Sequence, residues 1–435
     1  MEAKLRFSLA DTSGQVKSMG EANAQLGTEE LVLVPSAGAP LSIALRDVVS
    51  IEEMEYRILV QLRPSGSLML FNAGLKHEDL VRALYRSVNE LEMKDLLMDE
   101  RLLKQGVPGE AELIGPAGTK HIGKCETRLY ETALIVMPER GGLVRCRYGE
   151  VESVAVEDYR LVVSMESGDR LRLSKLGREI DPLRKGIMDG ASAITSAALD
   201  MVRDAFPGAE PSGALKAAQL LKDGRTAQRR EVEQACPGLW ASLEGKLSTY
   251  GIGDELGHLS STSGTDVLRI GMKRPLHAKE EPDYIFFLVP IYSPDRSKGG
   301  NALAFEASSS EEQGRATYFF RIWGRDEYRS MPAENMMGQA DDFSKRVAKG
   351  LEAVNFRREP IYLSEADLFT PERARYRYAV MRIPELRLLR ERFIGRIMHS
   401  SPEQWKQDVA SLLAFNVAQK DDLAVWKRSM EAQGP

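Results

Sequence analysis

The chain has 435 residues, of which 43% are hydrophobic and 28% charged, enough for about three globular domains. Its 59 basic and 64 acidic residues give a net charge of −5, which argues against coating nucleic acid or membrane through bulk charge. The chain has three cysteines, Cys125, Cys146 and Cys236, with no CxxC spacing. Because three is an odd number over 435 residues, a disulfide framework is excluded and a reducing compartment is expected. The N-terminus lacks the apolar segment of a signal peptide, and the longest apolar run, 284–292, is too short to span a bilayer. These features predict a cytoplasmic protein.

The first half of the chain contains an internal repeat. Residues 20–84 align without a gap on residues 123–187, and fourteen of the aligned positions are identical, among them Pro35 and Pro138. The offset of 103 residues is too long for a solenoid repeat. The repeat therefore indicates two copies of a whole domain, called copy one and copy two below.

Each copy is predicted to begin with strands and to end with a helix. Apolar and polar residues alternate in copy two, which predicts short strands over 133–138, 143–147, 151–156, 160–165 and 170–173. Asp181 and Pro182 then predict a helix start, with the aspartate as N-cap and the proline in the first turn. The apolar stripe of the corresponding helix in copy one consists of Leu80, Leu84, Val88 and Leu91.

This order of elements, six or seven short strands and then one amphipathic helix, resembles the pleckstrin-homology-like (PH-like) fold, and most of all the bacterial PH and GRAM-like domains. The resemblance covers residues 5–205 and rests on element order and duplication. It implies two tandem small β-barrel or β-sandwich domains, each closed by a C-terminal helix. PH domains usually carry a tryptophan in that helix, whereas this chain has Trp240, Trp323, Trp405 and Trp426, all outside the repeats. The alternative is another small β-barrel capped by a helix.

The second half of the chain is predicted to contain a connector and a mixed domain. Residues 207–213 have the composition of a linker, and short helices are expected at 214–222, 226–235 and 240–247. Four strand candidates predict an antiparallel meander, at 267–272, 284–291, 303–307 and 317–323. Helices are expected from residue 333 onward, with a break at Pro384 and an N-cap at Ser401.

The expected fold class is therefore α+β. We expect two tandem PH-like domains, a linker with a helical connector, and a C-terminal α+β domain with an antiparallel sheet, over residues 1–104, 105–206, 207–247 and 248–435. The sequence of the C-terminal domain shows no resemblance to a known family.

Copy two carries cations where copy one has none, and this difference predicts an anion-binding surface. Lys124 falls on Glu21 of copy one, for example, and Arg170 falls on Ser67. The PH-like resemblance implies that basic residues in the first β-hairpin bind phosphoinositides. The candidate residues are Lys120, His121, Lys124, Arg128, Arg145, Arg147, Arg170 and Arg172. The alternative is that they form the solvated faces of half-buried strands.

One stretch of copy two imitates a nucleotide-binding motif. Residues 118–125 nearly match the P-loop pattern GxxxxGK[ST], but Cys125 stands where a hydroxyl should bind magnesium. The residues that follow predict a strand and not the helix that a phosphate site needs. No nucleotide cofactor is therefore expected.

Motifs for catalysis and metal binding are missing from the sequence. The five histidines show no HExxH or HxH spacing, so no metal and no other cofactor is expected. No serine lies in a GxSxG motif. Asp254, His258 and Ser260 are only a triad on paper, because a triad is defined by geometry and not by closeness in sequence. We therefore expect no catalytic residues.

Residues 371–400 contain eight arginines, with Tyr376 and Tyr378 interleaved. Arginine with aromatic residues is typical of nucleic-acid binding. The alternative is an amphipathic helix whose arginine stems cover the edge of a core and pair with acids elsewhere. The acidic net charge favours this alternative, and nucleic acid is not expected as a partner.

The function that these features favour is a non-enzymatic scaffold whose tandem PH-like domains bind protein partners. A first alternative is a peripheral membrane adaptor that binds anionic lipid headgroups through copy two. A second is an enzyme of unknown class in the C-terminal domain, which a deep pocket lined by side chains of perturbed pKa would support. The absence of catalytic motifs and the average charge favour the scaffold.

Overall fold

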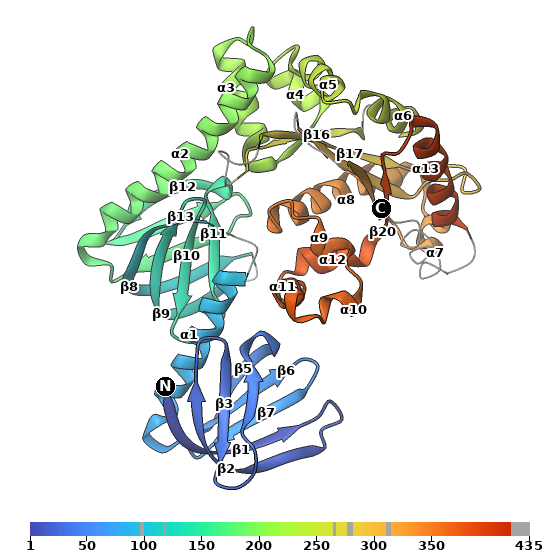
Figure 1. Cartoon of the computed structure of the whole chain (residues 1–435). Helices are drawn as coiled ribbons and strands as arrows, with labels where there is room; N and C mark the ends of the chain where they lie inside the picture. The colour runs from blue at the N-terminus through green and yellow to red at the C-terminus, as the bar shows by residue number, and fades with distance from the viewer. Residues whose placement is uncertain (96–99, 117, 264–266, 276–281, 310–314, 419–435) are drawn as a thin grey trace. The chain divides into compact units, whose positions relative to one another are not determined.

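The computed structural model describes residues 1–95, 100–116, 118–263, 267–275, 282–309 and 315–418 (Figure 1). It divides into two compact units. Unit 1 comprises Met1–Ser192 together with Glu365–Arg382, and unit 2 comprises Ala193–Ser364 together with the residues from Ile383 onward. Helix α2 (Ile180–Ala205) begins in unit 1 and ends in unit 2.

Copy one is a seven-stranded antiparallel sheet followed by a helix. Its strands lie in the order β4-β3-β2-β1-β7-β6-β5, so β4 and β5 are the edges. The bounds are β1 (Glu2–Ala10), β2 (Val16–Leu26), β3 (Glu30–Pro35), β4 (Leu41–Ala44), β5 (Val48–Met54), β6 (Arg57–Leu62), β7 (Gly66–Phe71) and α1 (His77–Asp95). The predicted stripe of α1, Leu80 to Leu91, is buried against the sheet, because every third or fourth residue faces it.

Copy two repeats this arrangement. Its strands follow the order β11-β10-β9-β8-β14-β13-β12, position for position the order of copy one. The bounds are β8 (Leu102–Gly115), β9 (Gly118–Tyr130), β10 (Ala133–Pro138), β11 (Val144–Arg147), β12 (Val151–Glu157), β13 (Arg160–Met165) and β14 (Arg170–Ser174). The sequence repeat thus corresponds to a repeat of topology.

The predicted N-cap of the closing helix in copy two is wrong. A short 3₁₀ turn, Gly177–Glu179, runs directly into α2, which therefore begins at Ile180 and contains Asp181. Lys175 and Gly177 have φ near +58° and +56°, so the chain turns into the helix before the aspartate is reached. Pro182 still lies in the first turn, where its missing N–H has no helical acceptor to lose.

Helix α1 packs on both copies. One side faces the sheet of copy one, and Met93 on another side packs against β10 of copy two. β10 is buried at every position, and Ala133, Ile135 and Met137 meet this helix. The corresponding strand of copy one has an exposed Val34 on that outer face. Both strands are apolar on this outer face, but only that of β10 is buried, by α1 at the contact between the copies.

Unit 2 is built on a six-stranded antiparallel sheet. Its order is β15-β16-β17-β18-β19-β20, with bounds β15 (Thr226–Gln228), β16 (Arg269–Lys273), β17 (Tyr284–Ile291), β18 (Ala302–Ser308), β19 (Ala316–Arg321) and β20 (Phe393–Met398). The predicted meander is confirmed as β16 to β19. The helix predicted over 226–235 is wrong in its first three residues, which pair with β16 as an edge strand.

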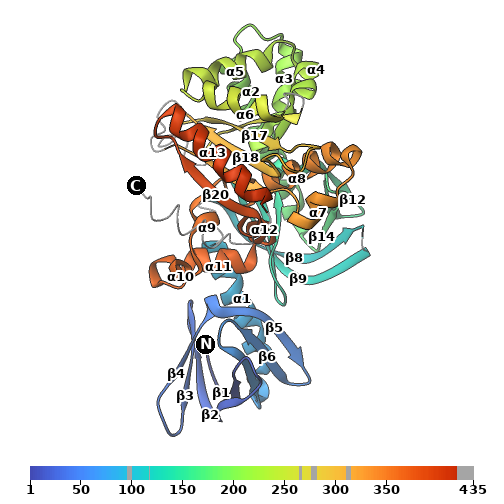
Figure 2. The ribbon, with the colours of Figure 1, turned by 90° about the vertical axis from the view of Figure 1, so that its right-hand side faces the viewer.

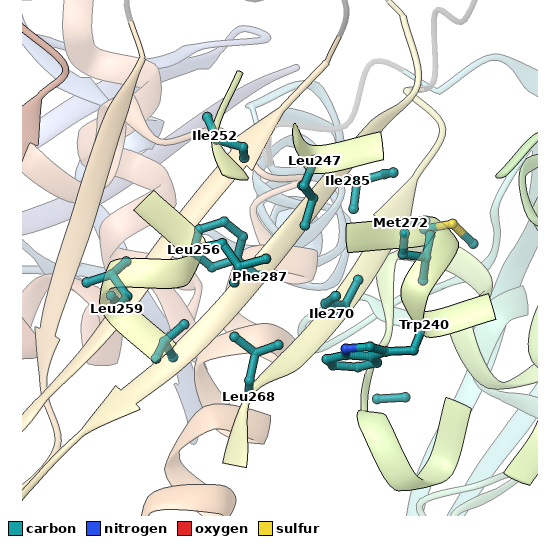
Figure 3. Packing of buried hydrophobic residues seen from close by; sticks show 14 of the residues in the cluster. Trp240, Leu247, Ile252, Leu256, Leu259, Leu268, Ile270, Met272, Ile285 and Phe287 are labelled. Carbon is teal, nitrogen blue, oxygen red and sulfur yellow. The ribbon is translucent and has the colours of Figure 1, made fainter. Parts of the chain in front are cut away.

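Helices cover both faces of this sheet, which explains why β16, β17 and β18 are buried at nearly every position. The core on one face includes Trp240, Leu259 and Phe287 (Figure 3). The helices that contribute to it are the C-terminal part of α2, α3 (Pro211–Leu221), α4 (Arg229–Ala235), α5 (Leu239–Thr249), α6 (Gly253–Ser263) and α13 (Pro402–Val417). On the sheet also pack α8 (Ala333–Ala353), α9 (Glu359–Tyr362) and α12 (Pro384–Arg392). The remaining helix of unit 2 is α7 (Arg325–Ser330).

Several predicted boundaries in unit 2 follow from local chemistry. Pro384 separates two helices, as predicted, because it cannot continue the preceding hydrogen-bond ladder. Ser401 caps α13 by accepting a hydrogen bond from the Gln404 amide. Half of the predicted linker is the first turn of α3, where Glu210 accepts from the Gly213 amide.

The architecture is a mixed α+β fold with antiparallel sheets. Among the described residues, no helix combines the length and the hydropathy needed to cross a bilayer. The three cysteines are buried and free. Burial raises the pKa of Cys125 to about 11 and that of Cys146 to about 12, so neither is a ready nucleophile.

Candidate functional site

Four of the eight predicted anion-binding residues lie on the outer face of the β8–β9–β14 part of copy two, namely His121, Lys124, Arg170 and Arg172. Lys120 pairs with Leu113 and so lies on the opposite face of the β8–β9 hairpin. Leu171 and Leu173 of β14 point into the core, so the alternating Arg170 and Arg172 point outward. In the sheet register, Glu112 of β8 lies between Arg172 of β14 and His121 of β9. The surface therefore alternates in charge from strand to strand.

Acidic neighbours pair with part of this surface. His121 lies 3.2 Å from Glu112, and the ammonium of Lys175 donates to Glu110 over 2.7 Å. Lys120 and Lys124 are exposed, and no described acidic group lies within ion-pair distance of either. These two ammonium groups of β9 are therefore available to an external anion.

The structure places the other three predicted residues elsewhere. The buried Arg128 donates to Glu90 of α1 over 2.6 and 3.0 Å and to Glu126 over 2.6 Å. Its contact with Glu90 lowers the pKa of that carboxyl. Arg145 forms an ion pair with the buried Glu100, and Arg147 lies on the same strand, β11, which β10 and β9 separate from β8. Arg128 is thus a link between the copies, and the eight residues form no single site.

A second surface, in copy one, was not singled out from the sequence. Helix α11 (Ala374–Arg382), from the arginine-rich segment, packs beside α1 (Figure 2). Tyr378 is fully buried there, and its hydroxyl lies 3.5 Å from the carbonyl oxygen of Val88. Residues about 290 positions apart in the chain are thus joined in one unit.

Arginines of α11 contact both carboxylates and backbone of copy one. Arg377 lies 2.9 Å from Asp47, and Arg382 lies 3.8 Å from Glu92. Arg382 also donates to the carbonyl oxygens of Val48 over 3.1 Å and of its neighbour in β5 over 3.2 Å. Of the two predicted roles for this segment, these contacts are those of a helix whose arginines cover a core edge.

Both carboxyl groups under α11 respond to burial. Burial raises the pKa of Asp47, and the charge of Arg377 opposes part of that rise. Burial likewise raises the pKa of Glu92, opposed by Arg382. The two arginines therefore stabilise carboxylates that would be costly to bury alone.

Unit 2 contains a buried polar cluster that sequence reasoning missed. The fully buried Glu306 accepts from the Thr317 hydroxyl over 2.5 Å and lies 3.1 Å from Nε2 of His399. The indole N–H of Trp405 donates to Thr317 over 3.1 Å, and Nδ1 of His399 lies 3.5 Å from Glu255. No sequence motif could reveal this cluster, because its members come from α6, the neighbouring strands β18 and β19, the residue after β20, and α13.

The titration of His399 reflects this environment. Burial alone would lower the pKa of His399, but its contact with Glu306 and the nearby charge of Glu255 outweigh burial and raise it. One carboxylate oxygen of Glu306 has no hydrogen-bond partner among the described residues. The cluster holds the sheet, α6 and α13 together, and its residues are packed among buried apolar side chains.

The triad-like residues of the sequence do not form a catalytic triad in the structure. Asp254, His258 and Ser260 all lie on α6, and no hydrogen bond joins the three side chains, all of which the structure describes. The ring of His258 instead meets the edge of Trp405, with centroids 5.6 Å apart. Burial lowers the pKa of His258.

A cavity of about 410 Å³ lies between α2, α5 and the β16–β17 hairpin of unit 2. Its polar lining includes Lys246, Tyr250 and Arg274, but Arg274 is held in a bidentate ion pair by Asp283. Burial raises the pKa of Tyr250. The described lining of this cavity contains no histidine, cysteine or serine, and no described group of three His, Cys, Asp or Glu residues could hold a metal ion.

No protein-family model matches this chain, and neither does any curated protein.

Proposed function

We propose that this protein is a non-enzymatic interaction scaffold whose two tandem PH-like domains bind protein segments. The observation that carries the proposal is the place where α11 binds copy one, against α1, Asp47 and β5, which is called the seat of α11 below. A helix from a distant part of the chain binds there between the edge strand β5 and the closing helix α1. Copy one therefore already holds a polypeptide ligand, in cis.

The chemistry of this seat supports a binding role. β5 is an edge strand whose pairing with β6 is irregular between Val48 and Ser50, and Arg382 donates to two backbone carbonyl oxygens there. Tyr378 supplies a buried aromatic anchor, and the arginines on either side supply charge-assisted contacts. Buried aromatics and arginines are the residues that dominate protein interfaces.

The element order supports the PH-like part of the proposal. Both copies have the same seven-strand order and a closing helix, as the resemblance implies. The conserved order also explains why both copies can offer an edge strand beside a helix. Only copy one has α11 on that edge.

Hydrogen exchange of the intact chain tests the proposal. The double variant Arg377→Glu/Arg382→Glu places two acids against Asp47 and Glu92, and we expect α11 to leave its seat. Amide protection should then fall in β5 and in the second half of α1. The matched control is Arg229→Glu/Arg230→Glu, which makes the same charge change at two exposed arginines of unit 2. Equal protection in the two variants would refute the proposal.

A second candidate function is binding of an anionic membrane surface through copy two. The observation that favours it is the pair of exposed ammonium groups of Lys120 and Lys124 on the β8–β9 hairpin, neither of which has an acidic partner among the described residues. The corresponding hairpin of copy one has Glu21 in place of Lys124. Two cations on one hairpin can contact lipid phosphates, and salt should weaken that contact.

Vesicle flotation tests this candidate. The intact chain should float with vesicles that contain an anionic lipid at low salt, and Lys120→Glu/Lys124→Glu should abolish flotation. The control is Lys4→Glu/Lys17→Glu, an equal charge change on the β1–β2 hairpin of copy one. Flotation that both variants lose equally, or that never occurs, would exclude this site.

A further inference from the structure

The first part of the arginine-rich segment belongs to a different unit from the chain on either side of it. Residues Glu365–Arg382 belong to unit 1, whereas the residues before and after them belong to unit 2. Within this range lie α10 (Glu365–Leu368) and α11, and α11 makes the contacts with copy one. A short helix with both flanks in another unit can leave its seat without unfolding either sheet.

The contact between α11 and copy one is more polar than a core. Tyr378 is the one large, fully buried side chain of α11, and its other contacts include ion pairs and arginine-to-carbonyl hydrogen bonds. In the described structure, Nε of Arg377 and Nε of Arg382 are buried without a hydrogen-bond partner. Interfaces of this polar, imperfectly satisfied kind are typical of contacts that form and separate.

The charges under α11 define what the seat recognises. Asp47 and Glu92 are mostly buried, with 22% and 14% of their side chains exposed, and each faces one arginine. The two arginines flank the aromatic anchor in the pattern Arg377-Tyr378-x-x-x-Arg382. In a helix, this spacing places the anchor and the second arginine on one face, one turn apart.

We propose that the α11 seat of copy one is an exchangeable binding site for a partner protein's helix of the pattern Arg-aromatic-x-x-x-Arg, with α11 as its resident occupant in cis. This inference rests on the proposed scaffold function and names the partner chemistry. A partner helix would replace the contacts with Asp47, Glu92 and the β5 carbonyls one for one. The resident helix lowers the fraction of molecules whose seat is open. The apparent affinity for a partner is the intrinsic affinity multiplied by that open fraction.

The test uses the full chain and a labelled synthetic peptide of residues 369–386, acetylated and amidated at its ends. We measure fluorescence anisotropy with the native chain and with Arg377→Glu/Arg382→Glu, in which the seat is open. The open variant should bind the peptide at least about tenfold more tightly than the native chain. A peptide with both arginines replaced by glutamate should not bind.

Charge exchange makes the assignment specific. Adding Asp47→Arg/Glu92→Arg to the open variant restores opposite charges between α11 and its seat. This quadruple variant should lose peptide binding and recover amide protection in β5. The amide protection of β13, which belongs to the sheet of copy two and not to that of the seat, reports whether each variant is folded.

The outcomes separate this inference from the proposed function. If the open variant loses protection in β5 but binds the peptide no better than the native chain, α11 is a cis ligand without exchange, and the inference is wrong. If β5 keeps its protection, the scaffold proposal itself is wrong. For a variant that fails to fold, Tyr378→Ala removes only the anchor and must show the same gain in peptide binding.

Discussion

Copy one and copy two share a strand order but use their surfaces differently. Copy one sends its helix α1 to the outer face of β10 in copy two, and it receives α11 on its own β5 edge. Copy two receives α1 on an apolar strand and carries exposed cations on the β8–β9 hairpin. The comparison teaches that two sheets of the same strand order can use their outer faces for different contacts.

The largest expected difference between the copies lies in the strand that meets α1. Ile135 of β10 is fully buried, whereas Val32, its counterpart in copy one, is only partly covered. Ile135→Glu should cost about 4 kcal/mol or more, because it buries a charge without a partner. Val32→Glu should cost about 1 kcal/mol or less. Chemical unfolding of both variants, followed by hydrogen exchange in the two sheets, measures the difference, and equal losses would break the comparison.

A smaller difference is expected at the ion-pair link. Arg128→Ala removes a buried guanidinium from Glu90 and Glu126, and Gln25→Ala changes the corresponding exposed position of copy one. We expect the arginine variant to lose about 2 kcal/mol, less than a fully buried pair would lose, because both acids keep some access to water. The glutamine variant should be close to neutral. Urea titration checks both, and a neutral Arg128→Ala would remove this residue from the junction.

The smallest effect concerns pH and extends the comparison to unit 2. The pKa of His399 is raised above its ordinary value of 6.5, so its protonated form is favoured in the folded state. Its stabilising contribution is therefore complete below about pH 6.5 and is lost as pH rises through the raised value. The melting temperature of unit 2 should fall by a few degrees over that range, and His399→Gln should flatten the decrease. A native chain with no such decrease would contradict this role.

Much of the fold follows from local patterns. The repeat, the strand alternation, the stripe of α1 and the break at Pro384 depend on residues near one another in sequence, and the structure contains all four. The predictions of secondary structure were wrong where neighbouring elements determined the local conformation. Residues 226–228 pair as a strand because β16 presents an open edge to them. Asp181 is no cap because the preceding 3₁₀ turn starts the helix first.

The candidate sites were less predictable than the fold. The contrast between Lys124 and Glu21 identified the exposed hairpin, because two aligned copies show which face changed. The same contrast could not separate Arg128, whose partner Glu90 lies 38 residues away on another domain. A cation in a strand looks alike in sequence whether it meets water or a neighbouring helix.

The sequence by itself determined the duplication, the antiparallel α+β class and the apolar stripes, since these depend on periodicity and on short-range sterics. Only the tertiary structure decided which cations are free, where α11 binds and how Glu306 meets His399. The physical reason is that charge and hydrogen-bond partners are chosen by distance in space. Glu306 and His399 are 93 positions apart in the chain, and Val88 and Tyr378 are 290 positions apart. Each pair comes into contact only once the sheets and helices have packed.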